Sequence, residues 1–141
     1  RVIEPAAVRL AAERATAADL AALREQLQHE QAAVHRFEQP HWARLASGFH
    51  LKLAGLAGNP ILQRYLVETV SRCSLIVALH EMPGNAACEH AEHERIVECI
   101  ARRDAAAAVA LMESHLRHLE RHITLDAAPP TRGLAHLLGL A

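Results

Sequence analysis

The segment HWARLASGFHLKLAGLAGNP (residues 41–60) contains one complete helix, the signal that ends it and the signal that starts the next. Its large apolar side chains recur every three or four residues, which is the spacing of one face of an α-helix: Trp42, Leu45, Phe49, Leu53 and Leu56. Gly58 suits the end of this helix, and Asn59 followed by Pro60 is typical of a cap and a first helical turn. We therefore predict a helix over residues 41–57 and another that begins at residue 60.

The same periodicity continues in both directions along the chain. It predicts further helices over residues 2–15, 17–37, 60–81, 87–102 and 105–125. Thr16 and Asp19 have the spacing of a capping box, and residues 82–85 (Met-Pro-Gly-Asn) form the clearest loop. Residues 126–141 contain two adjacent prolines and a glycine, and we expect a tail there with at most a short helix. The prediction is an all-α domain over residues 1–125, an antiparallel bundle of about six helices.

Composition supports this fold class and excludes several kinds of protein. The 141 residues include 29 alanines and only 3% aromatic residues, a balance that favours helices over a β fold. A net charge of −1 provides no basic face for nucleic acid. The sequence shows neither a membrane-length apolar stretch nor a secretory signal. Three cysteines without CxxC spacing favour a reducing cytoplasm, and we expect Cys73 and Cys99 to pack on apolar faces.

Histidine is unusually frequent, with 11 copies. On helical wheels, His93 falls inside the apolar sector of its helix, and His115 is the most inward histidine of its own helix. His50 flanks the stripe of residues 41–57 beside small alanines. A buried imidazole needs a partner for each nitrogen, and three such rings would satisfy this need together by binding a zinc-like divalent ion. The alternative is that each ring is a hydrogen-bonded core residue.

Other polar residues are weaker candidates for a metal or effector site. His90 is a further candidate ligand. His122 shares a flank with His115 and is a candidate for an alternative ligand. The competing interpretation is that these histidines lie on the surface. His80 lies near the end of an apolar stripe, where it could cap carbonyls or face a cavity. Arg72 is either a surface arginine or a bidentate clamp for a carboxylate ligand in the interior.

Motifs of common catalytic sites do not occur. His93-Glu94 does not continue into HExxH, and the Glu-x-x-His at Glu38 contains Pro40, so neither a zincin nor a ferritin-like di-iron pair is expected. The rival interpretation is a histidine-ligated metal hydrolase or a hemerythrin-like oxygen binder. It lacks an acidic residue in an obvious general-base position near the three histidines. A bundle that only dimerises, without a ligand, is the third class.

Four motifs in register resemble one known family. Arg-Val-Ile-Glu at residues 1–4 with Ala11-Ala12 resembles the opening of the FCD domain, the ligand-sensing C-terminal domain of FadR-type regulators in the GntR superfamily. Phe49-His50 with Gly-Asn-Pro at residues 58–60 resembles its FH…GN signature. Glu92-His93 before Ile96 resembles the start of its next conserved helix, and the pattern of its last helix is matched by Asp104, Ala108, Met112, His115 and Leu116. The resemblance covers residues 1–125.

The resemblance implies a helical domain, without enzymatic activity, that binds a small organic-acid effector and forms a homodimer in the cytoplasm. It implies a divalent metal, zinc or nickel, on three histidines that match His50, His93 and His115. The family's aspartate ligand stands four residues before the first histidine, where this chain has Ala46. Ser47, another histidine or water would then complete the coordination. Family members also carry an N-terminal winged helix-turn-helix that binds operator DNA; since the sequence begins at an arginine, we expect that module upstream.

Overall fold

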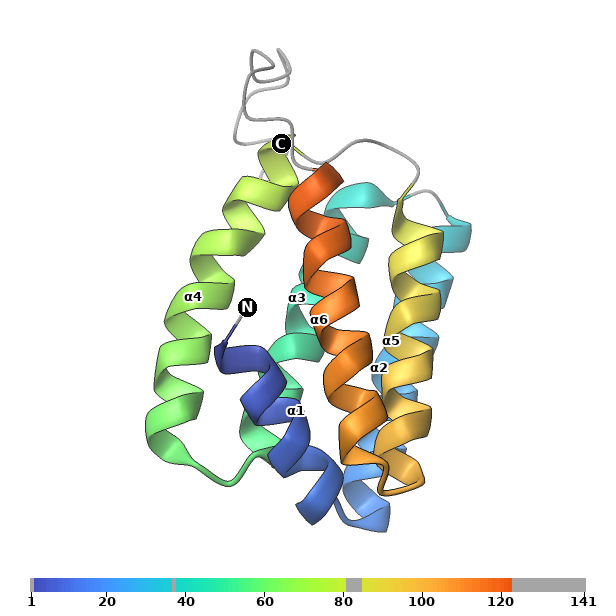
Figure 1. The fold of residues 1–141 in the computed structure, drawn as a ribbon. Coiled ribbons are helices and arrows are strands. Elements are labelled where there is room, and N and C mark those ends of the chain that lie inside the picture. Colours follow the sequence, from blue (N-terminus) through green and yellow to red (C-terminus); the bar gives the residue numbers. More distant parts are fainter. Residues whose placement is uncertain (1, 37, 81–84, 123–141) are drawn as a thin grey trace.

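Six α-helices and no strand are formed by the described residues, 2–36, 38–80 and 85–122, of the computed structural model (Figure 1). Their bounds are α1 (Ile3–Arg14), α2 (Ala17–His35), α3 (Gln39–Leu56), α4 (Pro60–His80), α5 (Ala86–Ala101) and α6 (Ala105–His122). The predicted all-α bundle is therefore confirmed. Most of the predicted loop at 82–85, the predicted end of the last helix and the tail at 126–141 lie outside these residues.

Local sequence signals account for the helix ends. The Thr16 side chain accepts a hydrogen bond from the Asp19 backbone while Asp19 accepts one from the Thr16 backbone, so the predicted capping box is present. Gly58 adopts a φ of 59°, the left-handed conformation that glycine tolerates best. Most described boundaries lie within one residue of the prediction, but α2 ends two residues earlier, at His35, and α3 begins two residues earlier, at Gln39. Pro40 lies in the first turn of α3, where a missing N–H costs nothing.

The helices pack around a core in which α3 is central. α3 contacts α1, α2, α4 and α5, while α6 packs against α1 and α5. Phe49, Ile96 and Met112 are fully buried at the centre of the main cluster. Cys99 is buried there as predicted, but Cys73 is exposed, because α4 makes its main contacts among the described helices with α3 and α1 and leaves other parts of its surface exposed. His50, His93 and His115 are also buried, on α3, α5 and α6.

None of the helices in the described part of the chain has the length and apolar character needed to cross a membrane.

Candidate metal centre

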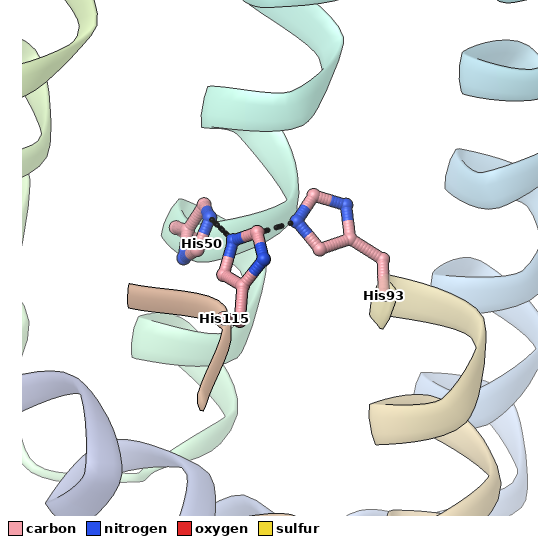
Figure 2. A group of neighbouring side chains, drawn as sticks. All are labelled: His50, His93 and His115. Atoms are coloured by element: carbon pink, nitrogen blue, oxygen red, sulfur yellow. Dashed lines mark hydrogen bonds between the residues drawn. The ribbon is translucent and has the colours of Figure 1, made fainter. Parts of the chain in front are cut away.

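The side chains of His50, His93 and His115 meet inside the bundle (Figure 2). The Nε2 atom of His115 lies 3.3 Å from Nε2 of His93 and 3.3 Å from Nε2 of His50. The His93 ring stacks on Phe49, with 4.1 Å between ring centroids, which fixes its orientation. Three helices thus bring three ring nitrogens to one point within the core.

A glutamate contacts the opposite nitrogen of each ring. The Nδ1 atom of His50 lies 2.5 Å from the Glu4 carboxylate of α1. The same atom of His93 lies 2.9 Å from Glu30 of α2. For His115 the partner is Glu92 of α5, at 2.7 Å. Carboxylates in these positions orient histidine ligands and raise their basicity in metal sites.

Burial and these contacts together determine the charges. Burial would raise the pKa of Glu30, but hydrogen bonds from His90 and His93 outweigh burial and lower the pKa to about 2. The pKa values of Glu4 and Glu92 are also lowered, again because their histidine partners outweigh burial. All three glutamates are therefore ionised at neutral pH.

The three imidazoles respond differently to their surroundings. Burial lowers the pKa of His93 to about 4 and also lowers the pKa of His115, so both rings are neutral at pH 7. At His50 burial acts in the same direction, but the Glu4 carboxylate outweighs it and raises the pKa. An ionised carboxylate can only accept hydrogen bonds, so each Nδ1 carries a proton. The neutral rings of His93 and His115 therefore direct Nε2 lone pairs toward the meeting point.

Hydrogen bonding among the protein atoms alone cannot satisfy this arrangement. The Nε2 atom of His115 has one lone pair, yet it faces a nitrogen on each side at the same distance. At most one of the two contacts is therefore a good hydrogen bond. A cation among the three nitrogens would use all three lone pairs. The donor set fits a divalent ion that prefers imidazole, because three histidines and open coordination positions form a known zinc arrangement.

Two of the further ligands expected from the sequence, Ser47 and His90, do not join the three histidines. Ala46 is buried, and the Ser47 hydroxyl bonds to the Ala43 carbonyl and to Ser74. His90 is buried and lies 3.4 Å from Glu30 through Nδ1, so it supports that carboxylate instead of the metal centre. His122 and His80 end α6 and α4, and their side chains are not among those that the structure describes.

Arg72 does not act as the expected interior clamp. Its side chain is 77% exposed and pairs with Glu68 one turn earlier on α4, at 2.6 Å. This corrects the prediction: the arginine lies on the outer surface of α4, because the face of this helix that contacts the bundle carries Leu66 and Val70.

The sequence interpretation missed the three glutamates. It looked for an acidic residue in a general-base position near the histidines and did not consider carboxylates that contact the Nδ1 side of each ring. All three come from helices other than those of their partners. Glu92, for example, contacts His115 of α6 although it shares α5 with His93. One of the three had a signal in the sequence. Glu30 falls in the apolar stripe of its helix, three residues after Leu27, where a charge requires a buried partner.

A cavity of about 410 Å³ adjoins the metal centre and lies between α4 and α6. His50 and Ala46 line it beside apolar residues such as Trp42, Val70 and Leu116. Its acidic lining residues are Glu4, Glu89 and Glu120, and no lysine or arginine is among the described residues that line it. The volume is within the range of small-molecule sites.

Comparisons with known proteins agree with the sequence resemblance. The sequence profile of the FCD domain matches residues 1–118 of the 141. A search of curated proteins found no match.

Proposed function

Because the chain belongs to the FCD-domain family, the ligand-sensing regulatory domains of GntR-type regulators, we propose that it is an effector sensor in which three histidines hold a divalent metal. The observation that carries this proposal is the convergence of three Nε2 atoms, each on a ring whose Nδ1 contacts a carboxylate. FCD domains are regulatory rather than catalytic. The FadR subfamily and a cytoplasmic location are part of the same proposal.

Zinc or nickel is the metal we propose for His50, His93 and His115, because imidazole suits both ions. When bound, the ion supplies positive charge and open coordination positions beside the cavity. Ala46 leaves the side of the cavity next to His50 without a protein ligand. We propose that a carboxylate of the effector or water completes the coordination there.

The cavity lining indicates what kind of organic acid would fit. Among the described side chains that line it, the acidic groups are three glutamates and there is no lysine or arginine, so a carboxylate in the ion-free cavity would be repelled by like charge. The remaining wall is mostly apolar and suits a hydrocarbon body. We therefore propose a small monocarboxylate with an apolar body, held at its head by the metal.

Binding of such an acid is expected to depend on metal. In isothermal titration calorimetry, a branched or aromatic monocarboxylate should release heat with the zinc-loaded protein and none after chelation, because the described lining contains no lysine or arginine to pair with the acid. A dicarboxylate of the same length should bind more weakly, since its second charge has no cationic partner in the lining.

Arg72→Ala provides a matched control, because that side chain lies outside the cavity and should leave acid binding unchanged. Equal binding with and without zinc would reject the metal-held effector. Zinc binding without response to any acid in a broad panel would leave the metal centre intact but remove the sensor function.

A route from effector to DNA follows from the place of the cavity. α4 packs against α3 and α1, and the cavity lies between α4 and α6. An occupant that contacts both helices would favour one α4–α6 separation over others. A ligand shifts the population of two conformations only when it binds one of them more tightly. We propose that this shift changes the spacing of two winged helix-turn-helix modules outside these 141 residues and so controls operator binding.

Homodimerisation is the remaining part of the proposal, and the outer face of α4 supports it. Four of its large apolar side chains are at least two-fifths exposed: Ile61, Tyr65, Val67 and Ile76. Such a concentration of apolar residues on one helix is typical of an interaction surface. An interface on α4 would also carry a movement at the cavity to the second copy.

Tyr65→Glu is expected to weaken the dimer, because it places a charge in the apolar face of α4. Sedimentation velocity should show a shift from dimer to monomer, with unchanged helical content by circular dichroism. Lys52→Glu, a charge reversal at an exposed site on α3, is the control and should leave the dimer intact. A Tyr65→Glu protein that remains fully dimeric would remove α4 from the interface.

A further inference from the structure

A second group of metal-ligating side chains lies on the outer side of α5 and α6. Cys88 and Glu92 of α5 and His118 of α6 place a sulfur, a carboxylate oxygen and an imidazole nitrogen within 4.8 Å of one another. The group differs from the buried one in access, because Cys88 is exposed and His118 is 40% exposed. An ion from solvent can therefore reach it without opening the bundle.

The positions of these ligands are fixed by the fold. Cys88 and Glu92 are four residues apart on α5, so their side chains lie on the same face of the helix. His118 is one turn after the buried His115 on α6, which packs against α5. Two helices that already pack against each other thus bring the three groups together. Binding of an ion would therefore restrict little further motion of the backbone, which lowers the entropy cost of binding.

Glu92 links the second group to the core. One of its oxygens accepts a hydrogen bond from Nδ1 of His115 at 2.7 Å, and the other contacts Nδ1 of His118. The first contact anchors the carboxylate, and its second oxygen is directed toward His118 and the thiol. A carboxylate fixed in this way resembles a supported ligand more than a freely rotating surface side chain.

We propose that Cys88, Glu92 and His118 form a second, solvent-accessible site for a zinc-class divalent ion. A thiolate with an imidazole and a carboxylate suits zinc and similar ions, whereas magnesium and calcium prefer oxygen ligands alone. Separations below 4.8 Å between ligand atoms are compatible with bonds of about 2.0–2.3 Å to one central ion. Water would occupy the fourth position. The proposal does not depend on metal at the three histidines.

Cobalt(II) distinguishes the two sites, because only the outer one contains sulfur. Titration of the reduced protein with cobalt should produce a near-ultraviolet sulfur-to-cobalt charge-transfer band, and zinc should displace it. Cys88→Ser should abolish the band and reduce the bound ions, measured by equilibrium dialysis and elemental analysis, by one per chain. His118→Asn should weaken cobalt binding at the outer site by roughly tenfold or more.

Cys73→Ser is the matched control, because Cys73 is also an exposed cysteine on a helix but has no ligand cluster around it among the described residues. It should keep the band and both ions. His93→Ala, which disrupts the buried centre, should also keep the band, so the outer site can be tested even where the inner one fails. The proposal is overturned if the wild-type protein shows no band, or if the band survives in Cys88→Ser.

Discussion

Replacing His115 by alanine is expected to remove metal binding at the buried centre. His115 is the middle ring of the three, and its Nε2 atom faces those of His93 and His50. Loss of one of three protein ligands should lower zinc affinity by about 100-fold or more, since complete structural zinc sites contribute about 10–16 kcal/mol. In the ion-free protein the same change removes a nitrogen that hydrogen bonds on both sides cannot satisfy, but it also leaves a cavity and removes the hydrogen bond to Glu92, so some stability is lost as well.

Met112 provides a matched comparison, because it lies almost one turn before His115 on α6 and is equally buried. Met112→Ala should lower the free energy of unfolding by about 2–5 kcal/mol, the usual cost of a cavity in a core. Zinc affinity should remain near that of the wild type. If the buried histidines bind metal, His115→Ala should therefore lose zinc affinity, whereas Met112→Ala should lose stability and keep its zinc affinity.

Both variants are best compared by urea unfolding in a chelator and by zinc titration. Use of a Cys88→Ser background restricts the titration to the buried centre. If His115→Ala binds zinc normally and destabilises the ion-free protein as much as Met112→Ala, the histidines are ordinary core residues. The proposed metal centre would then be wrong.

Helix periodicity was enough to predict the fold, because each helix buries one apolar stripe. Phe49 was in the predicted apolar stripe of its helix, and it is fully buried in one cluster with Ile96 and Met112 of two other helices. The same reasoning selected the histidines that meet, because an imidazole on an apolar face is directed toward the core. Such local patterns depend only on the 3.6-residue helical repeat. They can therefore be recognised without knowing which helices pack against one another.

Helical periodicity could not predict which side chains contact one another between helices. Glu4 and His50 are 46 residues apart, and their contact depends on how α1 crosses α3. Arg72 shows the opposite failure: it was considered for the interior, but α4 has neighbours on only part of its circumference. The side of a helix that remains in solvent is decided by which helices pack against it, and no single helix contains that information.

Glu30→Gln is expected to weaken zinc binding at the buried centre by about 10–100-fold, the usual effect of losing a carboxylate behind a ligating histidine. The Glu30 side chain is 0% exposed and lies 2.9 Å from Nδ1 of His93. Glutamine keeps the size and an accepting oxygen but loses the negative charge, so His93 becomes a less basic ligand. The structure should be retained, which circular dichroism would check.

Glu94→Gln is the matched control for this change. Glu94 is also near His90, with 3.6 Å between its carboxylate and Nε2, but it is 52% exposed and does not contact His93. Solvent screens its charge, so zinc affinity should change by about twofold or less. Equal zinc affinities for the Glu30→Gln, Glu94→Gln and wild-type proteins would show that the buried carboxylate does not act on the metal centre. A large loss confined to Glu30→Gln would show that the charge behind His93 is part of the metal site.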